Sequence, residues 1–506
     1  MVEHAQPSLD RTSARPRRGF FEGALEWASR EALLFTVVAL FFVGAAAALP
    51  RELFQDTWMA VLGGHEIVEH GLPSKEVLTI WTHGRDWVDQ QWLAQLGFYG
   101  LYALGGIKAV LAAHLLATAA AFTLAVVVAR SRGASTRSIC WVAAPAYFLL
   151  SWGAWNARAQ SLAVLLFVAV VALLVRDAHA PSRRVFFVLP LLVLWANIHG
   201  TALTGAALVA LSGVVFAIER RKQPRRGWLP RSAVLVGAPF LCLFASPYAA
   251  HLPQYYETMM FNSGFREWIV EWSPTAPNFQ TAPFYLLAFL ALWLLGRTGR
   301  RRLLPFEQAL LLATLLLGLQ SLRAVIWFTL VALMLVPFLL DDVWKSSAST
   351  IRFPRASRTA VVASVAVSIA VTAVLAGKPS SWYERSYPSG VLVAYDRLQA
   401  HDPHLRVFAN EAYGDWLLLR RPELRGRLAF DIRFELMSKR QLERLAAVRW
   451  RVDGWRRVVA PYGVFVLKSE EKRFARALLK EPGSRLEFRG QGAVVISRPT
   501  TVLGNR

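Results

Sequence analysis

Residues 56–93 read DTWMAVLGGHEIVEHGLPSKEVLTIWTHGRDWVDQQWL and form the longest polar run in the first two-thirds of the chain. The run begins a few residues after the first strongly apolar segment, and it is rich in carboxylates, histidines and tryptophans. Its first half has the spacing of a surface helix. Because the segments around it are apolar, this run is expected to be a loop between membrane spans. The side of the membrane on which it lies then fixes the sides of the other loops.

The composition predicts an α-helical polytopic membrane protein. Of the 506 residues, 55% are hydrophobic and only 18% are charged, which is less charge than a soluble protein of this size carries. A helix needs about 20 apolar residues to cross a bilayer. Apolar runs of roughly that length predict about eleven spans, at 32–49, 107–129, 138–153, 159–175, 186–198, 201–218, 231–247, 281–296, 303–319, 324–340 and 358–376.

Lysines and arginines gather in alternate loops. With the N-terminus inside, the inner segments hold 25 of them and the outer segments hold 6. Basic loops stay on the cytoplasmic side of membrane proteins, so residues 1–31 are predicted to be a cytoplasmic tail and residues 378–506 to lie outside. Many of the basic residues behind the net charge of +23 lie in loops between apolar spans, where they fix topology, which argues against nucleic acid as a partner. The two cysteines, Cys140 and Cys242, lie in apolar spans and are read as core residues.

Residues 378–506 change character and predict a small α/β domain attached to a membrane domain of residues 32–377. Amphipathic helices are expected in SKRQLERLAAV (438–448) and EEKRFARALLK (470–480). This segment contains no phosphate-binding glycine loop and no Gly-x-Ser-x-Gly motif. Short strands are expected in HLRVFAN (404–410), RLAFDIR (427–433), RRVVAPYGVFVL (456–467) and GAVVISRP (492–499).

The predicted outer loops hold nearly all of the unusual polar residues near membrane depth. Ionisable groups there are costly and usually mark a site or a pathway. Because they come from separate loops on one face, we expect them to converge. The central acid is Asp56, and its expected partners are Arg158, His199, Glu271 and Arg323. Further candidates for binding a substrate are Trp87, Asp89 and Lys108.

Asp56 has two readings. It lies about six residues past the first span, where a carboxylate can stay ionised at the water–lipid boundary and act on a headgroup held there. Aspartate is also a favoured helix N-cap, and position alone favours capping. Arginine grips phosphate oxygens bidentately, so Arg158 and Arg323, together with Lys108, are candidates for phosphate binding.

Three residues of the same loop, His65, Glu66 and Glu69, have helical spacing and are weak candidates to bind a divalent metal ion. The solvated face of an interfacial helix is the alternative. Trp87 is read either as part of an aromatic belt at the headgroups or as a sugar-stacking residue. His199 either joins the site or satisfies the backbone of a tight helical hairpin.

Several stretches together resemble one family: DTWMAVLGGHEIVEHGLP, GRDWVDQQWL, RAQSL, LWANIHGTALTG, SPY and IVEWSP. In their order along residues 32–340 the chain resembles the GT-C glycosyltransferases, which include the protein mannosyltransferases and lipid A aminoarabinose transferases. The resemblance implies an enzyme of the bacterial plasma membrane that uses a polyprenyl-phosphate-linked sugar, transfers the sugar at the extracytoplasmic face, and places Asp56 at the catalytic acidic position within an outer catalytic loop, residues 50–93.

The sequence departs from this family pattern at two points. Many relatives have two adjacent acids where this chain has Asp56 followed by Thr57. The WWDYG signature of oligosaccharyltransferases is absent, which argues against transfer of a whole glycan to asparagine. Two other functions remain as alternatives, a transporter or flippase for a lipid-linked glycan and a non-catalytic envelope membrane protein. A transporter needs charges in the middle of its spans, and the predicted span centres are almost free of charge.

Overall fold

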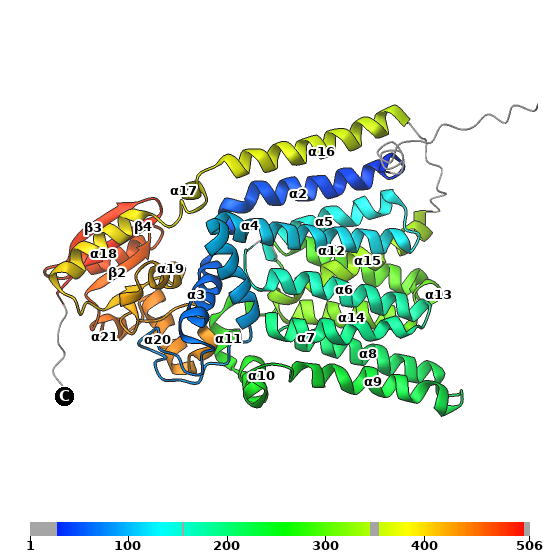
Figure 1. The fold of residues 1–506 in the computed structure, drawn as a ribbon, viewed down its shortest axis with the longest axis horizontal. Coiled ribbons are helices and arrows are strands. Elements are labelled where there is room, and N and C mark those ends of the chain that lie inside the picture. The colour runs from blue at the N-terminus through cyan, green and yellow to red at the C-terminus, as the bar shows by residue number, and fades with distance from the viewer. Residues whose placement is uncertain (1–27, 154–155, 345–353, 500–506) are drawn as a thin grey trace, which may run out of the picture.

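The structure is a computed structural model that describes residues 28–153, 156–344 and 354–499. Long helices lie side by side in one body, and a small sheet with its own helices lies at one end of them (Figure 1). The fold class is therefore confirmed as a helical membrane protein with a small C-terminal α/β part. The predicted cytoplasmic tail lies outside the described residues except for its last four positions.

The apolar body is built from eleven main helices among the described residues, and each falls where a span is expected. Their bounds are α2 (Ala32–Glu52), α4 (Trp92–Ser131), α5 (Thr136–Gly153), α6 (Gln160–His179), α7 (Val188–Ile198), α8 (Ala202–Arg220), α9 (Arg225–Leu243), α12 (Ala282–Leu294), α14 (Pro305–Gln320), α15 (Val325–Trp344) and α16 (Pro354–Gly377). By length and composition, seven helical segments of the described chain can cross a membrane. The number of crossings therefore stays a prediction.

Shorter helices connect and cover these spans. The first half of the polar run forms α3 (Gln55–His70), and the segment after α9 forms α10 (Leu252–Phe261) and α11 (Ser263–Trp268). A three-residue helix, α13 (Arg300–Arg302), lies between α12 and α14. The C-terminal part adds a further set of short helices. The set is α17 (Ser380–Tyr383), α18 (Ser389–His401), α19 (Glu411–Arg420), α20 (Lys439–Trp450), α21 (Trp455–Val459) and α22 (Lys472–Leu479).

Helix α4 is longer than the span expected at 107–129. It begins at Trp92 and is interrupted at Gly105 and Gly106, where Gly106 has a φ of 64°. That backbone conformation is strained for residues with a β-carbon and natural for glycine. The part of α4 before the break packs along α3, and its glycines lowered the apparent helical signal. The break therefore separates the added N-terminal segment from the segment expected to span the membrane at 107–129.

The C-terminal sheet has four strands in the order β1-β2-β4-β3. Strands β1 (Val407–Ala409) and β2 (Val464–Lys468) pair in parallel, whereas β4 (Ala493–Ser497) runs antiparallel to β2 and to β3 (Arg485–Gly490). Alternate residues of a strand face opposite sides of the sheet. Val464 and Val466 accordingly join a core shared with α3 and α4, while Phe465 and Leu467 join the core beneath α20, α21 and α22. The sheet is thus covered on both faces.

Three details of the predicted strands are wrong. Residues 427–433 do not form a strand and pair only through isolated bridges at Leu428. The charged side chains of Asp431 and Arg433 are buried, so apolar and charged residues do not face opposite sides. The segment Trp455–Val459 is helical, and its strand starts only at Val464. Strand β3 was not expected, since its arginines and glutamate make it polar; it lies at the exposed edge of the sheet.

The second half of the polar run, the first loop (residues 71–91), joins the sheet of the C-terminal part. The Ile80 and Trp81 amides donate to the carbonyls of Leu428 and Ala429, at 2.8 and 3.0 Å. Leu428 in turn bridges to Val407 of β1, so the loop extends the sheet beyond its edge. The Trp81 indole also donates to the Tyr462 hydroxyl at 2.8 Å. The first loop is therefore fixed to the C-terminal part by main-chain and side-chain hydrogen bonds.

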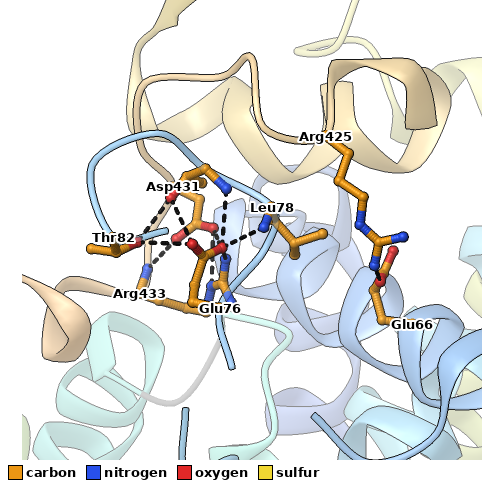
Figure 2. Close-up of polar contacts among 8 residues, drawn as sticks. Glu66, Glu76, Leu78, Thr82, Arg425, Asp431 and Arg433 are labelled. Atoms are coloured by element: carbon orange, nitrogen blue, oxygen red, sulfur yellow. Dashed lines mark hydrogen bonds and ion pairs between the residues drawn. The ribbon is translucent and has the colours of Figure 1, made fainter. Parts of the chain in front are cut away.

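A buried ion network, formed by Glu76, Asp431 and Arg433, lies beneath this contact (Figure 2). Glu76 is fully buried and accepts hydrogen bonds from the backbone amides of Leu78 and Thr79, at 2.6 and 3.0 Å. The Arg433 guanidinium donates to Glu76 at 2.7 Å and also to Asp431. Figure 2 also draws the contact of Glu66 in α3 with Arg425. The buried ion network joins the first loop to the C-terminal part, and the Glu66–Arg425 pair joins α3 to it.

Replacing Arg433 by methionine is expected to destabilise the folded protein by about 3–5 kcal/mol, because two buried carboxylates lose their countercharge. The measurement is the midpoint of thermal or chemical unfolding in detergent.

The matched control is Arg421→Met, which breaks a bidentate pair with Asp396 at 2.6 Å in which both side chains are partly exposed. Exposed pairs contribute about 0–1 kcal/mol. Equal losses in the two variants would contradict a structural role for the buried network.

Candidate functional site

Asp56 lies in the first turn of α3, directly after the bend that follows α2. The N-cap is Phe54, so Asp56 does not cap the helix. Its negative charge is still favourable there, because the helix dipole is positive at this end. The next residue ties the turn to another segment: the Thr57 hydroxyl donates to the carbonyl of Ala157 at 2.5 Å. This places the start of α3 beside the residue that follows Ala157.

That residue is Arg158, whose side chain is 8% exposed. One guanidinium nitrogen, Nη1, lies 3.9 Å from Asp56 Oδ2 and 3.3 Å from Glu271 Oε2. The backbone amide of Arg158 donates to the Ser161 hydroxyl at 3.4 Å, and that hydroxyl is hydrogen-bonded to His114 at 2.6 Å. A buried polar chain inside the bundle thus holds the segment that carries the arginine.

Glu271 lies between two arginines. Arg323, in the connection between α14 and α15, places Nη1 3.6 Å from Glu271 Oε2. The connection is held in place by the Ser321 hydroxyl, which donates to the Glu271 carbonyl at 3.0 Å. The Arg323 guanidinium also lies 5.6 Å from the centre of the Trp272 ring. One carboxylate therefore positions both cationic side chains.

His199 completes the group from the hairpin between α7 and α8. Its Nε2 lies 3.3 Å from Nη2 of Arg323, and its Nδ1 is 2.9 Å from the Thr201 hydroxyl. Burial, followed by the charges of Arg323 and Arg158, lowers the pKa of His199 well below its ordinary value. The imidazole is therefore neutral and accepts a hydrogen bond from the guanidinium. His199 thus contacts both its own hairpin, through Thr201, and the guanidinium of Arg323.

The structure thus brings together the five residues that the sequence placed in one group: Asp56, Arg158, His199, Glu271 and Arg323. We call them the ionic cluster. They come from five separate segments of the chain, and the cluster lies at the end of the helical body that meets the C-terminal part. Its two arginines and two carboxylates balance in charge, with the neutral imidazole beside them.

The two carboxylates of the ionic cluster differ in proton affinity. Burial raises the pKa of Asp56, the charge of Arg158 offsets this only in part, and Glu271 raises it further. For Glu271, burial also favours a higher pKa, but the attraction of Arg158 and Arg323 outweighs burial and the pKa is lowered. Asp56 is therefore the more basic carboxylate. Because 32% of its side chain is exposed, a ligand can reach it.

Lys108 does not join the ionic cluster. Its ammonium group donates to the carbonyl of Ala376 at the end of α16, at 3.1 Å. The α4 break at Gly106 turns this residue toward α16. It makes no hydrogen bond or ion pair with the cluster in the described structure.

Trp87 and Asp89 line the contact with the C-terminal part. The Arg433 guanidinium lies 4.3 Å from the centre of the Trp87 ring, so this tryptophan supports the buried ion network. Asp89 is 3% exposed, and its Oδ1 accepts from the Gln91 amide at 3.1 Å and from the Gln95 side chain at 2.9 Å. Asp89 is thus buried near the end of the first loop.

The candidate metal residues do not form a metal-binding group. Glu66 pairs with Arg425 and lies 3.4 Å from His70, the His65 ring packs against Tyr99, and Glu69 is exposed. Within residues 28–153, 156–344 and 354–499, no three His, Cys, Asp or Glu side chains are arranged to hold a metal ion. On this face of α3, Glu66 contacts Arg425 of the C-terminal part.

Sequence reasoning missed the charged residues that the C-terminal part adds near the ionic cluster. Asp415 and Glu435 lie close enough to Asp56 for its charge to act on them. Burial, together with the neighbouring Asp431, raises the pKa of Asp415 well above its ordinary value. For Glu435 the available pattern was FDIRFEL (430–436), whose alternation of apolar and charged residues predicts charged side chains that face solvent; the structure instead buries Asp431 and Arg433.

Comparison with solved structures reveals the same architecture elsewhere. The crystal structure of ArnT from Cupriavidus metallidurans bound to undecaprenyl phosphate aligns over 93% of this chain and 99% of its own, with a TM-score of 0.51 and 16% identity. The apo state of the same protein aligns over the same shares, with a TM-score of 0.50 and 15% identity. The chain therefore shares the fold of ArnT. No family model and no curated protein sequence matches it.

Asp89 makes folding stability depend on pH. Burial raises its pKa from 3.8 to about 7, against the opposing effects of the Gln91 amide and Arg433. Between these values the folded state binds more protons than the unfolded state, so the contribution of Asp89 to stability falls as the pH rises through about 4 to 7. Asp89→Asn keeps an oxygen for both hydrogen bonds, and it is expected to gain stability over the wild type on going from about pH 5 to about pH 8.

The measurement is the difference in unfolding midpoint between Asp89→Asn and the wild type at the two pH values. Asp86→Asn is the control, since a hydrogen bond from Lys75 lowers the pKa of Asp86 and leaves it ionised across this range. A difference that is independent of pH would contradict a buried, neutral Asp89.

Proposed function

We propose that this protein is an integral-membrane glycosyltransferase that moves a sugar from a polyprenyl-phosphate donor to an acceptor on the extracytoplasmic side of the bacterial plasma membrane. The observation that carries the proposal is the ionic cluster, a basic carboxylate beside two arginines at one end of a GT-C fold. In this proposal the N-terminus is cytoplasmic, and the cluster and residues 378–506 are outside, as the distribution of basic loops favours.

Asp56 is the proposed general base. It removes the proton from an acceptor hydroxyl, whose oxygen then forms a bond to the anomeric carbon while the bond from that carbon to the phosphate oxygen breaks. The configuration at that carbon inverts. The raised pKa of Asp56 supports the role, because a general base works best when its pKa lies closer to the working pH. Glu271, held by two arginines, is the less suitable base.

Arg158 and Arg323 are the proposed phosphate ligands. The leaving phosphate gains negative charge as the bond breaks, and fixed cations stabilise such charge in a site partly shielded from water. Glu271 orients both guanidiniums before the lipid arrives, at 3.3 and 3.6 Å. ArnT has been crystallised with undecaprenyl phosphate bound, which supports a polyprenyl phosphate as the lipid in this fold.

Asp56→Asn is expected to lower sugar transfer by about 10²–10⁴-fold, the usual contribution of a general base. The measurement compares lipid-linked sugars and envelope glycans by mass spectrometry in cells that lack the protein, complemented with wild type or variant. Donor should accumulate and the glycan should be lost with Asp56→Asn. Glu69→Gln, an exposed carboxylate of the same helix, is the control, and wild-type glycans with Asp56→Asn would refute the proposed role.

Arg323→Met is expected to weaken binding of undecaprenyl phosphate by about 10–100-fold, since a charge-assisted hydrogen bond contributes about 1.5–3 kcal/mol. Binding is measured with the purified protein in detergent or nanodiscs. Lys108→Met removes a cation outside the cluster and should leave the affinity unchanged. An equal loss in both variants would indicate a general effect of charge instead of a phosphate site.

A further inference from the structure

An open pocket of about 90 Å³ lies between the first loop, α10 and the C-terminal part. About 10–15 Å³ of such volume holds one water molecule, so the pocket has room for a group the size of one sugar ring and not for a larger ligand. No lysine or arginine lines it, which distinguishes its chemistry from that of the ionic cluster. Most of its lining is polar and uncharged or acidic: Asp86, His251, Gln254, Tyr255, Thr258 and Glu435.

Tyr255 connects this pocket with the ionic cluster. A β-carbon placed on Gly200 would lie only 2.8 Å from the Tyr255 hydroxyl oxygen, so the phenol lies against the backbone next to His199. The adjacent Tyr256 hydroxyl donates to the Gly200 carbonyl at 3.2 Å, which holds α10 to the hairpin. The charges of both Glu435 and Arg323 act on Tyr255. One wall of the pocket therefore borders the arginine proposed to bind phosphate.

Glu435 supplies the pocket with a carboxyl group that has no ion-pair partner among the described residues. It comes from a short turn, Phe434–Leu436, that follows the buried ion network in sequence. The other carboxylate of the lining, Asp86, is paired with Lys75 at 2.5 Å. Burial raises the pKa of Glu435 to about 7, although Arg433 opposes the shift. Near neutral pH this group both donates and accepts hydrogen bonds.

We propose that this pocket binds the ring of a hydroxyl-rich sugar beside the ionic cluster, and that Glu435 selects the sugar through hydrogen bonds to its hydroxyls. The inference rests on the proposed function and names a second part of the same site. Carboxyl, amide and hydroxyl groups pair with sugar hydroxyls, and Met259 and Leu436 offer apolar surface to the ring carbons. The lining itself contains no lysine or arginine, and Lys75 beside it is paired with Asp86, so the arginines of the ionic cluster remain the phosphate ligands. The sugar belongs either to the donor or to the acceptor.

The first arm of the test measures binding of undecaprenyl phosphate with and without a linked sugar, using a panel of hexose and pentose derivatives. If the pocket holds the donor sugar, wild type prefers one loaded lipid. Glu435→Ala then weakens binding of that lipid by about 10-fold and leaves binding of the bare lipid unchanged. Equal weakening of both lipids would overturn the inference, because Glu435 would then act on the phosphate.

The second arm measures sugar transfer to envelope fractions from cells that lack the protein. If the pocket holds the acceptor sugar, Glu435→Ala leaves both lipid affinities unchanged and raises the KM for the envelope fraction by about 10-fold. Unchanged lipid binding together with an unchanged KM would overturn the inference while the proposed function stands. A wild-type protein that binds no undecaprenyl phosphate would instead overturn the proposed function, and the inference with it.

Two further variants separate binding from folding. Thr258→Trp fills the pocket from an exposed position of α10 and leaves Glu435 in place, so it should reproduce the effect of Glu435→Ala. Glu267→Ala removes a half-exposed carboxylate whose partner is Lys439, at 3.7 Å, outside the pocket, and it should behave as wild type. If Thr258→Trp has no effect on either arm, the pocket is not a sugar site.

Discussion

Two guanidinium groups at one end of the helical body, those of Arg158 and Arg323, impose the main constraint on this structure. A buried charge without a partner costs on the order of several kcal/mol, and Arg158 is 8% exposed. Glu271 pairs with both guanidinium groups. Asp56 lies beside Arg158, and the neutral His199 accepts a hydrogen bond from Arg323. Five segments far apart in sequence must therefore end at one place, which determines how the helices that carry them are arranged.

Thr57 shows how the chain meets this constraint at the start of α3. Its hydroxyl accepts from the Phe54 amide at 3.3 Å and donates to the Ala157 carbonyl at 2.5 Å. A carboxylate at this position could not donate to a carbonyl. The threonine thus fastens the first turn of α3 to the segment that carries Arg158, and it leaves Asp56 as the one carboxylate of this turn.

The C-terminal part also contributes to the surroundings of the ionic cluster. The first loop adds main-chain hydrogen bonds to its sheet through Ile80 and Trp81, and Glu76 enters a buried network with Arg433 and Asp431. This arrangement places Glu435 and Asp415 where the charge of Asp56 reaches them. The environment of Asp56 is therefore determined by both parts of the chain, and a change in the C-terminal part alters it.

The sequence by itself determined the helical membrane class, the positions of the main helices and the group of polar residues that belong together. Apolar runs and a one-sided set of ionisable groups are local or additive signals, and Asp56, Arg158, His199, Glu271 and Arg323 were all visible in them. Only the tertiary structure decided which carboxylate is the basic one, because burial and distance to the arginines separate Asp56 from Glu271. It also decided that Lys108 lies away from the ionic cluster and that Glu435 of FDIRFEL lies near it. The reason is that contacts between segments distant in sequence leave no periodic pattern in the chain.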